Sequence, residues 1–320
     1  MKPSKPGQDK IKAVSYEIRA IIEDYRSEIV GGALCELELW KICALPSLLS
    51  SSSTWMEVKP EAVEIAEQLQ LNFLRLLFKV PKSCPRSALR SESGLLSIKY
   101  QIVIAKLSLL FHIRNMEEET LAKQVYNHQL LYGWPGLVRE GIKLCEELGI
   151  PDVTKVKASD KEFKWMIKKA CMLKDQEELK LDMSSKEKLH LLKEEDCKQK
   201  PYISEMSLPD VRILFRHKTR MTKSAENYKK LPKYTGEGAK CKFCLQYDSH
   251  SHIMRCEAFL HLRSPEVCLD NDVHLVKYIR QVLHLREDKE EQEQKEKKEQ
   301  EGAGRSRKEK EGAGRNHDAK

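Results

Sequence analysis

The chain has 320 residues, 33% of them charged, and a net charge of +8, which allows one fair-sized core beside much solvated chain. No apolar run reaches the roughly 18 residues that a membrane span needs, and the first ten residues contain no apolar signal segment. The composition therefore argues against a membrane partner and against secretion. We expect an intracellular protein, with the nucleus as one compartment open to it.

The ten cysteines fit an intracellular compartment. Seven of them are scattered, several inside apolar helical patterns, and in a reducing compartment such residues are most often small buried hydrophobes. We therefore expect free thiols rather than a disulfide framework at Cys35, Cys43, Cys84, Cys145, Cys171, Cys197 and Cys268.

Helical periodicity dominates the first half of the chain. Residues 95–113 are apolar nearly all round, which is typical of the central helix of a bundle. Pro46 is expected to kink the helix that contains it, and no stretch shows the period-2 alternation of a strand. We predict a disordered N-terminus at 1–9 and an all-α bundle over 10–150. Its expected helices span residues 10–30, 33–49, 60–77, 95–113, 116–130 and 136–148.

The second half is thinner in apolar residues. Residues 151–204 have helical period but are dominated by Lys and Glu, which predicts a helical linker. A basic helix and a compact Cys/His module are expected over 205–286. Residues 287–320 are charge-dense, contain EGAGR twice and are predicted to be disordered beyond their first turns. The predicted fold class is thus mainly α: a helical bundle, a helical linker, a small zinc-knuckle module and a disordered charged tail.

Three cysteines and two histidines gather in CKFCLQYDSHSHIMRC, residues 241–256. A Cys-x2-Cys turn lets two thiolates reach one ion, and a His-x3-Cys pair sits one helical turn apart. Four such ligands match tetrahedral Zn²⁺ and leave no open position, so one structural zinc ion is expected. His250 is the alternative histidine, at a shorter spacing than we expect. The predicted ligands are Cys241, Cys244, His252 and Cys256.

The positive charge is concentrated directly upstream of this cluster. From Val211 to Lys242 there are ten Lys/Arg against two Asp/Glu, whereas residues 286–320 contain eleven of each. Arginine forks bind phosphate oxygens and tyrosine rings stack on unpaired bases, so RNA or DNA is the expected partner. A solvated charged face is the alternative. The candidate nucleic-acid-binding residues are Arg212, Arg216, Lys218, Arg220, Lys223, Tyr228, Lys229, Lys230, Lys233 and Tyr234.

Four segments together resemble the part of non-LTR (LINE-class) retrotransposon polyproteins that follows the reverse transcriptase fingers and palm. They are ELWKICALPSLLSSSSTW (38–55), LQLNFLRLLFKVPKSCPRSALRSESGLLSIKYQIVIAKLSLLFHI (69–113), QVYNHQLLYGWPGLVREGIKLCEELGIPDV (124–153) and CKFCLQYDSHSHIMRCEAFLHLR (241–263). The resemblance covers roughly residues 10–285. It implies a thumb-like bundle beside a primer–template and a CCHC zinc knuckle.

The chain also lacks residues that the catalytic activity of that family requires. The polymerase of that family needs paired metal-binding aspartates, and no Asp-Asp pair occurs here. Nor does the sequence contain a serine-hydrolase elbow, a phosphate loop or a zinc-protease motif. We therefore expect a non-catalytic nucleic-acid-binding fragment. The alternatives are a zinc-containing protein–protein adaptor, with the partner on the helical bundle, and an element remnant with no selected function.

Overall fold

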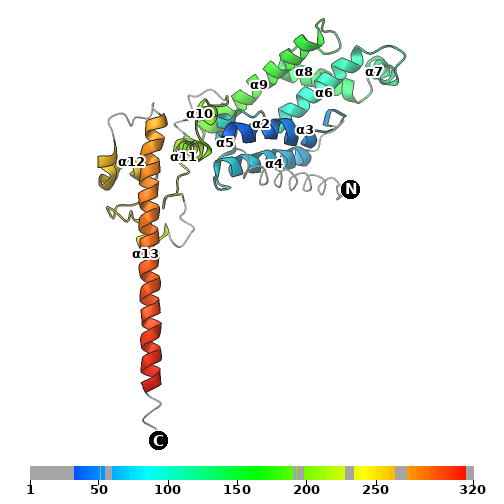
Figure 1. Cartoon of the computed structure of the whole chain (residues 1–320). Coiled ribbons are helices and arrows are strands. Elements are labelled where there is room, and N and C mark those ends of the chain that lie inside the picture. Colours follow the sequence, from blue (N-terminus) through cyan, green and yellow to red (C-terminus); the bar gives the residue numbers. More distant parts are fainter. Residues whose placement is uncertain are drawn as a thin grey trace. The chain divides into compact units, whose positions relative to one another are not determined.

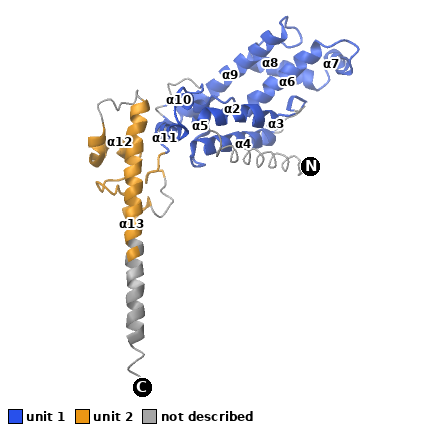
Figure 2. Ribbon diagram, viewed as in Figure 1, with its two compact units in different colours: residues 1–221 blue, residues 222–320 orange. Residues whose placement is uncertain are grey.

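The computed structural model describes residues 32–50, 52–54, 60–189, 192, 198–227, 234–263 and 272–314. The elements in these ranges are helices, and the one β-pairing among them is the isolated bridge between Lys240 and Tyr247. The predicted mainly α fold class is confirmed. The predictions for residues 1–9 and for the helix at 10–30 lie outside the described residues. The chain divides into two compact units, residues 1–221 and 222–320 (Figure 2).

Unit 1 is a bundle of helices (Figure 1). Its helices are α2 (Ala33–Leu39), α3 (Leu45–Leu48), α4 (Pro60–Phe78), α5 (Arg86–Ser93), α6 (Ile98–Arg114), α7 (Leu121–Tyr132), α8 (Leu137–Leu148), α9 (Asp160–Ser184), α10 (Tyr202–Glu205) and α11 (Leu208–Lys218). Residues Trp40–Ala44 form a π-helical turn between α2 and α3. This irregularity lies just before Pro46, which lacks the N–H that a regular helix would use at that point.

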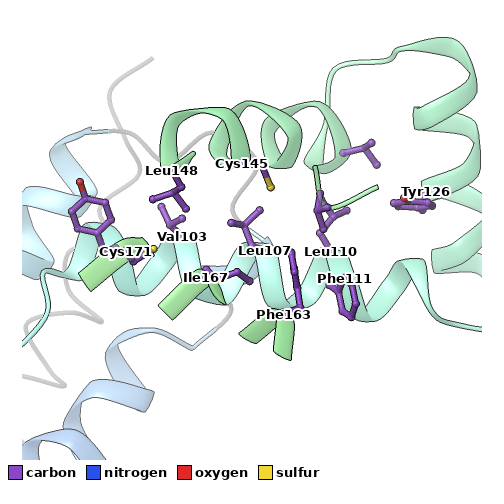
Figure 3. Close-up of a cluster of buried hydrophobic side chains, with 13 residues drawn as sticks. Val103, Leu107, Leu110, Phe111, Tyr126, Cys145, Leu148, Phe163, Ile167 and Cys171 are labelled. Carbon is purple, nitrogen blue, oxygen red and sulfur yellow. The ribbon is translucent and has the colours of Figure 1, made fainter. Parts of the chain in front are cut away.

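The core of unit 1 lies between α6, α8 and α9 (Figure 3). Helix α6 begins at a Ser97 cap, whose side chain accepts from the N–H of Tyr100. It contributes Leu107 and Phe111 to the core, and Phe111 stacks on Phe163 of α9 with ring centroids 4.3 Å apart. The expected central helix, apolar nearly all round over residues 95–113, is observed as α6, which begins at Ile98 because Ser97 caps it.

The residues predicted as a helical linker, 151–204, contain a core element of the bundle. Helix α9 buries a side chain at every fourth position along its length. One buried side chain per turn is enough to dock the 25 residues of α9, so few apolar residues suffice. The sequence analysis missed this stripe because lysine and glutamate fill the positions between. The buried residues are Phe163, Ile167, Cys171, Asp175, Leu179 and Met183.

The basic helix α11 packs against α4 within unit 1, so the predicted module 205–286 is divided at Met221. Phe215 stacks on Phe78 with ring centroids 3.9 Å apart. Arg212 Nε donates to the carbonyl of Leu77 (2.7 Å), and Arg216 donates twice to the carbonyl of Lys79 (3.1 and 2.6 Å). These carbonyls end α4, where a cation also complements the negative end of the helix dipole.

His217 lies on the buried side of α11, and its pKa is lowered to about 4 by burial and by the charges of Lys218 and Arg220. Its ordinary value is 6.5, so the unfolded chain takes up the proton first as the pH falls. We expect unit 1 to lose about 1.4 kcal/mol of stability per pH unit from 6.5 down towards 4 on account of this group.

The test is urea unfolding followed by tryptophan fluorescence, because all four tryptophans precede residue 222 and report on unit 1. The comparison runs between about pH 7.5 and about pH 5.5, where carboxylates contribute little. The variant His217→Gln should show a flatter dependence. Equal pH dependence in both proteins would contradict the assignment.

Unit 2 contains α12 (His252–Arg255) and the long helix α13 (Asp272–Gly314). The charged segment predicted to be disordered from residue 287 continues as α13 to Gly314. Glu, Lys and Gln are good helix formers, and pairs such as Glu291 with Lys295 have the i, i+4 spacing that stabilises a solvated helix.

Within the described residues, no single helix is both long and apolar enough to cross a bilayer. Helices α5 and α6 satisfy the length and composition together, with a bend of 56° between them.

Candidate metal centre

A tight turn brings the first two cysteines together. Leu245 has a φ of 61°, and its N–H donates to the carbonyl of Cys241 (2.8 Å). The N–H of Cys241 in turn donates to the carbonyl of Gln246 (2.7 Å), and the neighbouring pair Lys240 and Tyr247 forms an antiparallel bridge. The backbone therefore folds back around the side chains of Cys241 and Cys244.

The second pair of candidate ligands comes from the single turn of α12. The N–H of Cys256 donates to the carbonyl of His252 (2.8 Å), which places the two side chains one turn apart. Cys244 Sγ lies 3.2 Å from His252 Nε2 and 3.6 Å from Cys256 Sγ, and Cys241 Sγ lies 3.9 Å from Cys256 Sγ. The four ligand atoms all lie within 4.8 Å of one another.

These separations fit one metal ion. Sulfurs at about 2.3 Å from a tetrahedral zinc lie roughly 3.8 Å apart, close to the sulfur–sulfur distances here. The predicted group Cys241, Cys244, His252 and Cys256 thus converges and could hold one metal ion. No fifth His, Cys, Asp or Glu of the described residues joins the group.

His250 is drawn away from this centre. Its Nδ1 lies 2.7 Å from the hydroxyl of Thr222, and its backbone N–H donates to the carboxylate of Glu226 (3.0 Å). The side chain is buried, with 5% exposed. His250 therefore ties the start of unit 2 to the Cys/His module, and His252 is the histidine that faces the cysteines.

Helix α13 holds the module from one side. Tyr278 is buried and donates to the carbonyl of Ile253 in α12 (2.8 Å). Phe243 meets Phe259 edge to face at 4.8 Å, and Lys289 of α13 lies 4.4 Å above the Phe243 ring. The apolar residues of unit 2 thus form a small core between α13 and the Cys/His module.

An ion pair links α13 to the same module. Arg286 Nη2 lies 3.0 Å from Asp248 Oδ1, and the two side chains are only 15% and 13% exposed. The guanidinium of Arg286 lowers the pKa of Cys241 and so favours its thiolate. The sequence analysis missed Tyr278, Asp248 and Arg286. Tyr278 and Arg286 lie more than 20 residues beyond Cys256, the last of the four candidate ligands, and no local motif marks any of the three.

The pKa values of the candidate ligands follow from their burial and from the groups that surround them. The pKa of Cys241 is lowered. Burial by itself would raise this pKa, but hydrogen bonds from the backbone N–H groups of Phe243 and Cys244 and the charge of Arg286 outweigh the effect of burial. Burial raises the pKa of Cys256 to about 12, and the neighbouring thiols add to the effect. Burial lowers the pKa of His252, which favours the neutral imidazole that binds metals.

The candidate nucleic-acid residues are scattered over both units. Arg212 and Arg216 bind the carbonyls that end α4, and Lys218 lies 5.3 Å above the ring of Tyr202. Arg220 has a φ of 55° and is half-buried. These contacts give the arginines a structural role in unit 1, and their role in phosphate binding stays a prediction.

The remaining candidates belong to unit 2. Lys223 is exposed and Tyr234 is half-buried. Both line a pocket of about 660 Å³ beside Cys241. Tyr228, Lys229, Lys230 and Lys233 lie outside the described residues.

Comparisons with protein-family models, with curated proteins and with solved structures give no match to this chain.

Proposed function

We propose that the metal is Zn²⁺ and that its role is structural. Three soft sulfur ligands and one imidazole are a donor set that zinc prefers over magnesium, calcium or manganese. All four coordination positions would be filled by protein, so no position is left for a substrate. The positive charge of Arg286 would offset part of the net negative charge of three thiolates on a divalent ion.

We propose further that the chain is a non-catalytic protein that binds RNA or DNA through this module. The convergence of the four ligand atoms is the observation that carries the proposal. Around it, Lys223, Arg255 and Arg263 are exposed cations of unit 2. Leu245 and Tyr247 of the Cys-x2-Cys turn are 71% and 50% exposed, which offers bases an apolar surface.

A salt titration of the zinc-bound full chain tests this proposal. Fluorescence anisotropy should be measured with labelled single-stranded RNA and single-stranded DNA of about 20 nucleotides. With about five phosphate contacts, log affinity should fall against log salt with a slope of about −3.5. Chelation of the metal should weaken binding about tenfold or more, because the module would lose its fold. A flat salt dependence, or no binding at low salt, would refute the proposal.

A protein adaptor is the second candidate, and one surface of unit 1 favours it. On α7, His128, Tyr132 and Trp134 of the following turn stack at centroid distances of 5.6 Å between neighbours. Leu121 and Leu131 are 76% and 74% exposed on the same helix. Exposed apolar and aromatic side chains gathered in this way mark interaction sites. A partner that binds after nuclease treatment and is lost with Trp134→Ala would favour the adaptor.

The relation to non-LTR retrotransposon polyproteins remains a proposal that rests on the four sequence segments. On that view, the bundle would be thumb-like and the Cys/His module would be a CCHC zinc knuckle.

A further inference from the structure

Helix α9 presents a second basic surface, outside the stretch 211–242 that the sequence analysis singled out. Between residues 155 and 174 there are seven lysines and two acidic residues. Six of these lysines are exposed, and five of them remain when Lys155, which pairs with Asp152, is set aside. We call them the α9 lysine face: Lys157, Lys161, Lys164, Lys168 and Lys169.

The geometry of α9 aligns three of these cations. Lys161, Lys164 and Lys168 stand at positions i, i+3 and i+7, which share one side of a helix. The core residues Phe163 and Ile167 point to the other side, toward α6 (Figure 3). The row spans about 10 Å at 1.5 Å per residue, or roughly three nucleotide steps at 3.4 Å each along a duplex strand.

The five lysines differ from their neighbours in their ion pairs. Among the described residues, none of them forms an ion pair, whereas their neighbours Lys155 and Lys174 pair with Asp152 and Glu177. The nearby Glu162 is engaged in the capping box with Ser159. The α9 lysine face is therefore a surface whose charge no ion pair of the described residues offsets.

The pocket beside the metal centre differs in this respect. Its Lys240, Lys242 and Arg286 each pair with a carboxylate. Of the ten cations counted between Val211 and Lys242, Lys240 and Lys242 thus have carboxylate partners.

A large aromatic side chain lies within the α9 lysine face. Trp165 is 63% exposed, and Lys169 Nζ lies 4.9 Å above its ring. An exposed tryptophan among unpaired lysines combines the two elements that single-stranded nucleic acids use: cations for phosphates and a flat ring for a base. Anionic lipid is the other polyanion with this chemistry. The buried stripe of α9 is packed in the core, and beside the lysines the helix exposes only Trp165, Met172 and Leu173, together with Leu181 near its end, which is less than the broad apolar face of a bilayer-bound helix.

We propose that the α9 lysine face binds the phosphate backbone of a single-stranded nucleic acid and that Trp165 stacks on one of its bases. The inference rests on the proposed function for the partner class, but it assigns a site in unit 1 that does not depend on the metal.

The test uses the full chain with bound zinc and a labelled single-stranded oligonucleotide of about 20 nucleotides. The variant carries Lys161→Glu, Lys164→Glu and Lys168→Glu. The matched control carries Lys82→Glu, Arg139→Glu and Lys180→Glu, which change the charge of unit 1 equally at exposed positions outside the α9 lysine face; Lys180 is 12 residues beyond Lys168 along α9. The α9 variant should bind about tenfold or more weakly, and its salt slope should become shallower by about 2, or roughly 0.7 per lost contact.

Trp165→Ala should weaken binding at least about fivefold and leave the salt slope unchanged, because stacking releases no counterions. The α9 triple variant should also be compared in a His252→Gln background. Residual binding there that the α9 charge reversal removes would support the inference.

Several outcomes would overturn it. Equal loss in the α9 variant and the control would show a general charge effect. Binding that His252→Gln abolishes, and that the α9 variant leaves unchanged, would confine the contact to unit 2 and refute this inference alone. Binding to phosphatidylserine vesicles, lost in the α9 variant, with no binding to the oligonucleotide would assign the face to lipid. No binding of the wild type to RNA or DNA would refute the proposed function as well.

Discussion

Replacing His252 by Gln, or removing the metal with a chelator, is expected to unfold the Cys/His module while unit 1 remains folded. Structural zinc in modules of this kind supplies about 10–16 kcal/mol of apparent binding free energy at neutral pH. The apolar core of unit 2 is small and is built around the four ligands, so it cannot compensate for such a loss. Unit 1 has its own core between α6, α8 and α9.

Metal analysis of the purified protein gives the stoichiometry, expected to be one zinc per chain. Hydrogen exchange over residues 241–263 should accelerate strongly in His252→Gln, and tryptophan fluorescence should stay unchanged because unit 2 contains no tryptophan. His250→Gln is the matched control. It removes a buried histidine two residues away that contacts Thr222 instead of the cysteines, so it should retain the metal. Loss of metal in His250→Gln but not in His252→Gln would contradict the ligand assignment.

Replacing Asp175 by Ala is the substitution expected to destabilise unit 1 most. The carboxylate of Asp175 binds Arg90 of α5, and the two side chains are only 4% and 13% exposed. It also accepts from the N–H of Ser97 at the start of α6 (3.4 Å). The substitution leaves a buried guanidinium without its counter-charge, which costs about 3–5 kcal/mol.

Urea unfolding followed by tryptophan fluorescence measures this loss. Glu64→Ala is the control, because its pair with Arg86 is half exposed and should contribute under about 1 kcal/mol. The double variant Arg90→Met with Asp175→Leu should recover most of the stability, since removing both charges also removes their desolvation. A cost under about 1 kcal/mol for Asp175→Ala would show that Arg90 finds water or another partner.

Much of the fold could be predicted because the signals are local. The apolar run from Leu95 to Ile113 and the glycines at 94 and 149 delimit helices by their own propensities. Helix α9 could not be recognised as a core element. Its buried stripe advances by four residues at a time and is outnumbered by lysine and glutamate, and only packing against α6 reveals it.

By itself, the sequence determined the four residues that meet at the metal centre. They fall within 16 consecutive residues, so short turns and one helical turn suffice to bring them together. It left two histidines as alternatives, and only the tertiary structure separated them, because Thr222 and Glu226 hold His250 aside.

The tertiary structure alone decided where the positive charge is available. Counting cations along the chain favours residues 211–242, but a count cannot tell which side of a helix a cation occupies. Arg212 and Arg216 turn toward the carbonyls at the end of α4, whereas Lys161, Lys164 and Lys168 are exposed and form no ion pair with a described carboxylate. The difference arises because each helix turns its apolar stripe toward the core. That orientation about the helix axis then decides which charged residues face solvent and which face a neighbouring helix.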